Sequence, residues 1–493
     1  MIPTLAFRHL WVKKARSLFL LLGFGLGVAV MIVLLSVGEA LLQQSRDVAL
    51  VGGGELTVLP EGIDVEAMRT GGLSGMFFGI DRARYLTRQV LGGPRHAGWV
   101  RTVAPAIEGK LLYLERNGRV VPVRAGGEIP SRAAAVGAGL DLRAGTWRDS
   151  PADSAWLAPD PERLYHELDR FHLPPHPDST WAEWHYFNLV VGPREWWYLT
   201  FLVGGEVGAG RWGGLLLATH RRPDGRYERF TARVPSSEIA LDTTRADLRL
   251  GASFVRQRGG LYTLHAEGPG ARGPLRLDLT VHPAPARYFP PVELRADRFV
   301  SGYVVPALAA KASGRVCVGR DCAAVRDAGA YHDHNWGVWR GVTWEWGAAQ
   351  GERLNVLYGG VYAPEGGGPD GATAETGGTA PLFLVLVDSL GVQQVLRFRG
   401  IHYRGSEAAA GLPGGRRPER FDLVAAREAD TVRLRVRVTD GLVSRAGPAA
   451  GARRFLQMRG RFTLHGRVLG RIVADSGSGF FETYLDGAPI FRR

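Results

Sequence analysis

The sequence predicts a mainly β protein, with antiparallel strands in barrels or sandwiches, preceded by one membrane-spanning helix. Segments such as Leu275–Val281 and Val432–Val438 alternate apolar and polar residues, which is typical of strands with one buried face. Glycine, tryptophan and tyrosine are abundant and long runs of helix-forming residues are scarce. Near the N-terminus, Leu18–Val37 contains no charged residue, and no later segment approaches that length without one.

The uncharged stretch Leu18–Val37 has the length of a membrane span. A helix that rises about 1.5 Å per residue crosses the roughly 30 Å hydrocarbon core with about 20 residues. A cleaved signal peptide is the alternative, but its apolar part is normally shorter and ends in a small-x-small site, so we expect an uncleaved anchor. Arg8, Lys13, Lys14 and Arg16 flank the stretch and predict a cytoplasmic N-terminus. We therefore expect a single-pass protein of the bacterial inner membrane, with its bulk extracytoplasmic.

The order of segments along the sequence predicts that the chain has four parts. A Pro/Asp-rich linker separates a small α+β extracytoplasmic segment from two β-rich domains. The expected bounds are 1–45 for the basic tail and anchor, 46–158 for the small segment and linker, and 159–345 and 346–493 for the β domains. Two Gly/Pro/Ala-rich insertions, Pro364–Pro381 and Gly405–Pro418, are predicted to be disordered.

The net charge of +13 does not indicate a nucleic-acid partner. All but four of the 61 basic residues are arginine, and they are scattered through strand-like segments instead of forming a run. Such a distribution is typical of solvated sheet faces and a biased codon composition.

The two cysteines lie five residues apart, on either side of a predicted hairpin turn. If Gly319 and Arg320 form a two-residue turn, Cys317 lies directly opposite Cys322 and a disulfide becomes possible in an oxidising compartment. Two free thiols are the alternative. A single cysteine pair without a second pair at ligand spacing does not predict zinc.

Aromatic residues cluster in Trp181–Phe187 and Glu195–Phe201. This density is typical either of a wide apolar cavity or of a large packed core, and the sequence leaves both open.

A second cluster, Tyr331–Gly337, carries polar groups on both faces of a predicted strand. Tyr331, Asp333 and Asn335 share one face, and His332 shares the other with His334 and Trp336. The two histidines lack an obvious third ligand on a neighbouring strand, so no metal and no cofactor is expected. An Asp in an aromatic surrounding acts as a general acid if burial raises its pKa, or as a structural strut if it is only hydrogen-bonded.

These residues resemble the carotenoid 1,2-hydratase (hydroxyneurosporene synthase) family, which includes AttH-like lipocalin proteins. The resemblance rests on Tyr331–Gly337, on Trp344–Gly347, on Glu183–Phe187 and on Gly477–Tyr484, and it covers about 160–493. It implies two tandem lipocalin-like antiparallel β-barrels. The sequence departs from the family pattern at His185, where an aromatic residue is common.

The resemblance also implies roles for individual residues. Asp333 would be the proton donor to a carbon–carbon double bond, Tyr331 and Trp336 would support the positive charge, and His332 would orient the site. The expected ligand is a hydrophobic small molecule or lipid. The residues expected to line its site are Glu183, Trp184, Tyr186, Trp197, Tyr198, Trp344 and Trp346.

The first 150 residues resemble a different family, the ABC-transporter permeases of the lipoprotein-release or macrolide-export type. The resemblance rests on Ala6–Leu10 before the anchor and on Leu56–Gly62 after it. It implies an ABC-transporter ATPase and permease as partners, although the three further spans of such permeases are absent from this sequence.

Three functions follow as hypotheses. The chain is an acid catalyst that hydrates, dehydrates or isomerises an alkene, a non-catalytic carrier of an apolar ligand, or an accessory subunit of an export complex. Because lipocalin-like barrels host both carriers and enzymes, the fold does not choose among them.

Overall fold

The structure is a computed structural model in which two compact units are distinguished. It describes residues 14–50, 58, 83, 86–87, 90–91, 95, 98–136, 148–150, 153, 169–172, 181–296, 299–338, 343–362, 382–446 and 453–485. The first unit comprises residues 1–91 and 99–158, and the second comprises residues 92–98 and 159–493.

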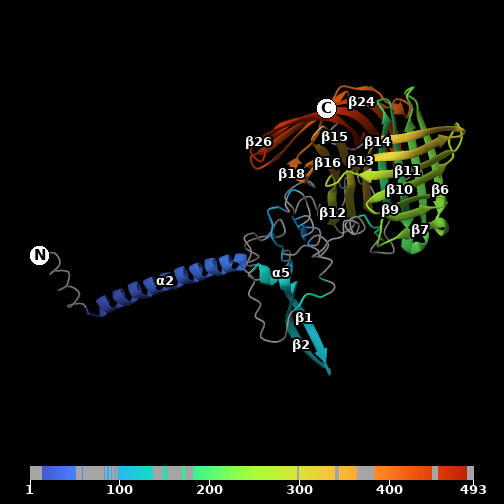
Figure 1. Ribbon diagram of the computed structural model, residues 1–493. Helices are drawn as coiled ribbons and strands as arrows, with labels where there is room; N and C mark the ends of the chain where they lie inside the picture. Colours follow the sequence, from blue (N-terminus) through green and yellow to red (C-terminus); the bar gives the residue numbers. More distant parts are fainter. Residues whose placement is uncertain are drawn as a thin grey trace. The chain divides into compact units, whose positions relative to one another are not determined.

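The described part of the first unit includes the helices α2 and α5 and a hairpin. These are α2 (Lys14–Leu50), α5 (Pro130–Ala135), and the antiparallel pair β1 (Ala106–Arg116) and β2 (Arg119–Glu128), all labelled in Figure 1. Asn117 and Gly118 form the turn between β1 and β2, and both have positive φ, 52° and 71°. Asn-Gly is the residue pair that such two-residue hairpin turns favour.

The predicted anchor, Leu18–Val37, lies inside α2, and many of its large apolar side chains are exposed. Among the described residues, no helix combines the length and the apolarity required to cross a bilayer. The anchor therefore stays a prediction.

The first sheet of the second unit is large and antiparallel. Its order is β6-β5-β4-β3-β14-β13-β11-β10-β9-β8-β7, with β12 paired to β13. Phe230 of β6 and Leu248 of β8 share one core although they lie at opposite ends of this order, so the sheet curls round on itself. We call it the first barrel. Its elements are β3 (Trp181–Gly192), β4 (Glu195–Glu206), η1 (Val207–Ala209), β5 (Arg211–Arg221), β6 (Tyr227–Pro235), η2 (Ser236–Glu238), β7 (Ile239–Asp242), β8 (Asp247–Leu250), β9 (Ser253–Arg258), β10 (Leu261–Gly268), β11 (Leu275–Pro283), β12 (Phe289–Ala296), β13 (Phe299–Val318) and β14 (Asp321–Val338).

The other sheet, which we call the second barrel, closes on itself. Strands β15, β16, β17, β18, β23, β24, β25 and β26 pair with their neighbours in that order, and β26 pairs again with β15. An antiparallel up-and-down barrel of eight strands is the lipocalin topology. The elements are β15 (Thr343–Gly351), β16 (Asn355–Tyr362), β17 (Leu382–Asp388), β18 (Gly391–Phe398), β19 (His402–Arg404), β20 (Glu407–Ala408), β21 (Ala410–Gly411), β22 (Arg416–Arg417), β23 (Arg420–Arg427), β24 (Asp430–Ala446), β25 (Arg453–Val468) and β26 (Arg471–Tyr484).

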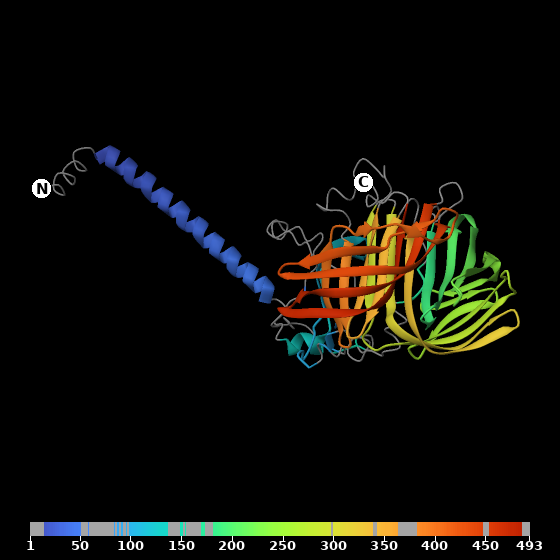
Figure 2. The same ribbon diagram turned by 90° about the horizontal axis from the view of Figure 1, so that it is seen from above.

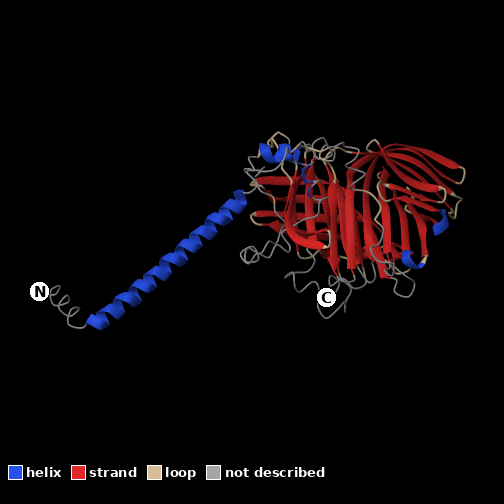
Figure 3. Cartoon of the chain, turned by 90° about the horizontal axis from the view of Figure 1, so that it is seen from below, coloured by secondary structure: helices blue, strands red, loops and turns tan. Residues whose placement is uncertain are grey.

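Each barrel has its own apolar core, and a third apolar cluster lies between them. We call this third cluster the interbarrel layer. From the first barrel it contains Tyr186, Trp196, Tyr198, Phe289, Tyr303, Val305, Leu308 and Tyr331, and from the second Trp346, Ala348, Leu357, Val385, Val387 and Phe480. The strands of the two barrels, green to yellow and orange to red, lie side by side in Figure 2, and strands dominate this unit in Figure 3.

Two expectations about the second β domain change. The insertion Gly405–Pro418 is not disordered, because Ala410 pairs in parallel with Leu442 of β24 and Arg417 donates to the carbonyl oxygen of Val438. The second barrel begins at Thr343, three residues before the expected boundary at 346. The insertion Pro364–Pro381 lies outside the described residues.

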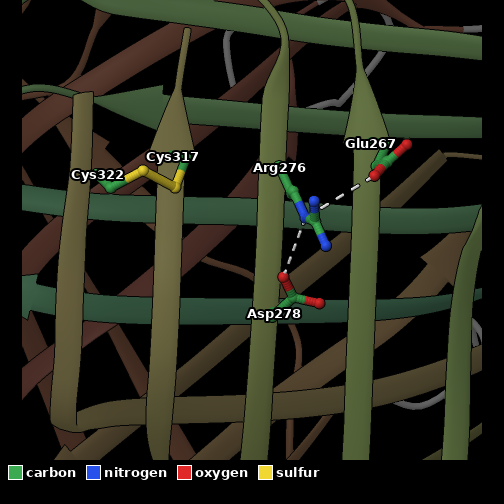
Figure 4. The surroundings of a disulfide bond; sticks show 5 residues. All are labelled: Glu267, Arg276, Asp278, Cys317 and Cys322. Carbon is green, nitrogen blue, oxygen red and sulfur yellow. Dashed lines mark ion pairs between the residues drawn. A yellow bond between two sulfur atoms is a disulfide. The ribbon is translucent and has the colours of Figure 1, made fainter. Parts of the chain in front are cut away.

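The hairpin of β13 and β14 carries the two cysteines. Val318 pairs with Asp321 and Cys317 with Cys322, in the register that a two-residue turn produces. A disulfide joins Cys317 and Cys322. Figure 4 shows it beside Arg276 of β11, which makes ion pairs with neighbouring carboxylates.

Candidate functional site

The alternation of strand β14 presents different side chains to two compartments. Asp333 pairs with Tyr186 of β3, and His334 pairs with His185. Because residues paired across strands share a face, Asp333 faces the interbarrel layer with Tyr186, and His334 faces the interior of the first barrel with His185. The strand thus separates an acidic site from a histidine cluster.

The acidic site centres on Asp333, whose side chain is 2 % exposed. The Tyr331 hydroxyl donates to Asp333 Oδ2 at 2.7 Å, and Asn335 Nδ2 donates to Oδ1 at 2.6 Å. The Trp346 indole, from the second barrel, donates to the Tyr331 hydroxyl oxygen at 2.9 Å. Both barrels therefore position this carboxyl group.

Burial raises the pKa of Asp333 to about 8, although the hydrogen bond from Tyr331 opposes the shift. A nearby carboxylate, Glu482, raises the pKa of Asp333 further, and the hydrogen bond from Asn335 lowers it. At neutral pH the carboxyl is therefore mostly protonated and able to donate its proton.

A second carboxyl group, Glu482 of β26, enters the same layer from the second barrel. The Tyr186 hydroxyl donates to Glu482 Oε1 at 2.7 Å, and Gln457 Nε2 donates to the same oxygen at 3.0 Å. Burial raises the pKa of Glu482 above its ordinary value. In the sequence Glu482 is only part of a strand motif. Phe480, Glu482 and Tyr484 are spaced by two residues, and this spacing is the signal that places Glu482 on the layer face.

The structure brings together most of the residues expected to line a ligand site. Tyr186, Tyr198 and Trp346 are buried in the interbarrel layer, and Trp184 and Trp344 pack at its half-buried margin, with ring centroids 6.3 Å apart. The rings contact one another directly, so they form a packed layer and not the wide cavity that the sequence left open.

A small pocket of about 30 Å³ adjoins Tyr331 in this layer. Asn188 and Arg459 line it, and Asn188 Oδ1 and Arg459 Nη1 have no hydrogen-bond partner among the described residues. Such a volume holds about one water molecule when polar groups surround it.

Several residues that were expected to line the ligand site lie outside the interbarrel layer. Trp197 packs in the core of the first barrel and stacks on His220, with centroids 3.9 Å apart. Trp336 stacks on His172 at 4.0 Å, on the face of β14 opposite Asp333. Glu183 also lies on the first-barrel side of the sheet.

His332 and His334 belong to a fully buried cluster inside the first barrel. His332 Nδ1 lies 3.0 Å from the carbonyl oxygen of Tyr186, and His332 Nε2 lies 3.2 Å from Asp169 Oδ2. His334 lies between two carboxylates, 2.7 Å from Asp169 Oδ1 and 2.8 Å from Glu183 Oε1. Burial would lower the pKa of His334, but these two bonds outweigh it and raise the pKa to about 9.

This cluster corrects the expectation that the two histidines lack a third ligand. His185 lies on the neighbouring strand β3, and Asp169 approaches from the segment that precedes it. The ligand atoms of Asp169, His185 and His334 lie within 4.8 Å of one another. Asp169 had no sequence signal, because it lies in a segment without periodic pattern.

Comparisons with known proteins find matches among solved structures. No family model and no curated protein matches it. A crystal structure described as a candidate AttH from Nitrosomonas europaea matches 64% of this chain and 97% of its own, with 14% identity and a TM-score of 0.44. CghA with Sch210972 matches 63% and 90%, with 12% identity and a TM-score of 0.44. Kievitone hydratase from Nectria haematococca matches 62% and 89%, with 13% identity and a TM-score of 0.41.

Proposed function

We propose that this protein is a hydro-lyase-type acid catalyst that acts on a carbon–carbon double bond of a hydrophobic ligand, such as a polyene, terpenoid or lipid. The observation that carries the proposal is the Asp333 carboxyl group, buried between two barrels among aromatic rings and held by Tyr331. A carboxylic acid in an apolar, π-rich surrounding suits protonation of an alkene, because aromatic faces stabilise the cation that forms.

The proposed reaction adds water across the double bond. Asp333 gives its proton to one alkene carbon, and the π electrons form the new C–H bond, which leaves a carbocation on the other carbon. A water molecule forms the C–O bond, and its extra proton passes to a carboxylate, Glu482 or the ionised Asp333. The net change is alkene plus water to alcohol, and the reverse sequence is dehydration.

The position of each group supports this division of roles. Tyr186 and Trp346 lie beside the two carboxyls, where their rings would stabilise the developing cation. The pocket at Tyr331 has room for the single water molecule that the reaction consumes. His332 and Trp336, on the other side of β14, support the strand from behind and take no part in proton transfer.

A ligand reaches Asp333 only if side chains at the margin of the layer move. The half-buried margin is formed by Trp184 and Trp344, and Asn335 connects it to Asp333 through a hydrogen bond. We therefore expect entry between these two indoles, and substitution of Trp344 by Ala should raise ligand on-rates.

The decisive experiment compares wild type with Asp333→Asn on polyenes and terpenoids in detergent micelles, with Glu345→Gln as matched control. Glu345 is equally buried, and burial raises its pKa to about 8, but it lies inside the second barrel, bonded to Tyr403 and Thr483. Loss of at least about 100-fold in turnover in Asp333→Asn alone is expected for a proton donor. If wild type binds a ligand and converts none, the protein is a carrier and the proposal fails.

We also propose that the catalyst is tethered to the bacterial inner membrane with its barrels outside the cytoplasm, possible partners being an ABC-transporter ATPase and permease. The uncharged stretch Leu18–Val37, its basic flank and the Cys317–Cys322 disulfide support this location. Retention of the protein in alkali-washed membranes, lost on deletion of residues 1–45, tests the tether. Co-purification of an ATPase that depends on residues 46–158 tests the partner.

A further inference from the structure

We propose that the first barrel holds one divalent transition-metal ion, of the zinc or cobalt type, bound by Asp169, His185 and His334. This site lies behind the acidic site, on the opposite face of β14, and it is independent of the proposed reaction.

The ligand atoms already have nearly the spacing that such an ion requires. Around a tetrahedral zinc with bonds of roughly 2.0–2.1 Å, ligand atoms lie about 3.3 Å apart. Asp169 Oδ1 lies 2.7 Å from His334 Nδ1 and 3.8 Å from His185 Nδ1, which bracket that value. The His185 and His334 rings are 4.2 Å apart between centroids. Small side-chain rotations would bring the three ligand atoms to this spacing.

His185 supplies independent evidence for a missing partner. Its side chain is fully buried, and neither of its ring nitrogens has a hydrogen-bond partner among the described residues. A buried polar group without a partner destabilises the folded protein, because it has lost its hydrogen bonds to water. A bound metal ion would accept the lone pair of one ring nitrogen and remove this cost.

The surroundings hold the ligands in the orientation that metal binding needs. The Tyr262 hydroxyl donates to Asp169 Oδ2 at 2.6 Å, which leaves Oδ1 directed at the histidines. Glu183 Oε1 accepts from His334 Nε2, and the backbone N–H of His172 donates to both Glu183 oxygens at 2.8 and 2.9 Å. A carboxylate that accepts from the far nitrogen of a histidine ligand is the usual supporting shell of a metal site.

Two carboxyl groups contact His334, Asp169 at Nδ1 and Glu183 at Nε2, so the cluster supplies negative charge that would attract a cation.

The ligand set limits the metal. Two imidazole nitrogens and one carboxylate oxygen suit zinc, cobalt, nickel, copper and iron, and not magnesium or calcium, which prefer oxygen ligands. Three protein ligands leave a fourth position for water. The Phe171 ring lies 5.1 Å from that of His334 and adds an apolar wall to the cluster.

The test is titration of the full-length, EDTA-treated protein in detergent with Co²⁺ and Zn²⁺. The expected result is one Co²⁺ per chain with the visible absorption of tetrahedral cobalt, displaced by one equivalent of Zn²⁺. Absence of stoichiometric binding overturns the proposal.

Variants locate the ion. His185→Phe and Asp169→Asn should each weaken Co²⁺ binding by at least about 100-fold. His220→Phe is the matched control, because His220 is also buried but lies outside the cluster, bonded to Glu195 at 2.9 Å. Circular dichroism checks folding, and His185→Phe should keep or raise the melting temperature of the metal-free protein because it removes unpaired polar atoms. Wild-type affinity in a folded His185→Phe variant refutes the site.

Discussion

Replacement of Asp333 by Asn should stabilise the protein at neutral pH while it abolishes proton donation. The side chain is buried and its pKa lies near 8, against 3.8 for an ordinary Asp. The folded protein must therefore take up a proton that the unfolded chain does not hold at pH 7. Asn has the same shape, carries no charge and keeps hydrogen-bonding atoms toward Tyr331 and Asn335, so it escapes this cost.

The magnitude follows from the two pKa values. Each pH unit between them is worth about 1.4 kcal/mol, so the cost at pH 7 is at most about 4 kcal/mol. Because the pKa in the folded state is raised, the cost is absent below about pH 4, grows with pH and levels off above about pH 8. The gain from Asp333→Asn should thus be about 3 kcal/mol larger at pH 7.5 than at pH 5.

Urea unfolding of the EDTA-treated protein, followed by tryptophan fluorescence at both pH values, measures this difference. Glu345→Gln is the positive control, since burial also raises the pKa of Glu345 to about 8. A gain from Asp333→Asn that does not depend on pH, while the control does, would show that Asp333 is ionised in the folded protein. The proton-donor assignment would then be wrong.

Three further substitutions test the same site and the hairpin that carries it. Tyr331→Phe should destabilise the protein by about 1–3 kcal/mol, because it leaves buried partners unpaired, and it should raise the pKa of Asp333, read from the infrared carboxyl band. Glu482→Gln should lower the pKa of Asp333, since the Glu482 charge raises it; an unchanged band midpoint would rule out the interaction between the two carboxyls. Paired Cys317→Ser and Cys322→Ser should cost about 2 kcal/mol in urea, because the disulfide closes only a short loop; a cost above about 5 kcal/mol would contradict the entropic account.

The strands of the barrels could be predicted because alternation is a local signal. Leu275–Val281 lies in β11 and Val432–Val438 in β24, as their period of two predicts. The strands around Gly405–Pro418 could not be predicted, because short pairs such as Ala410 with Leu442 depend on a neighbour that is distant in sequence. Closure of the second barrel through β15 and β26 is likewise a long-range pairing without a local signal.

Only the part of the candidate site that lies on one strand, β14, could be predicted from the sequence. Alternation separates Asp333 from His334 correctly, because side chains along a strand point to opposite faces. Glu482 comes from another barrel, so only the fold shows that it lies near Asp333. Asp169 comes from a segment without periodic pattern, so only the fold reveals it. The aromatic residues signalled burial, but a dense run of rings is equally compatible with a cavity and with the packed layer that the structure contains.

The alternation of β14 constrains how this protein can be altered. Replacement of a single residue in β14 changes one compartment only, because Asp333 and its neighbour His334 face different ones. Insertion or deletion of one residue within the strand instead exchanges the two faces and would turn the carboxyl into the barrel and the imidazole toward the other barrel. Substitutions can therefore change the acid and the histidines separately. A change in the length of Asp321–Val338 within the strand would disrupt both the acidic site and the histidine cluster.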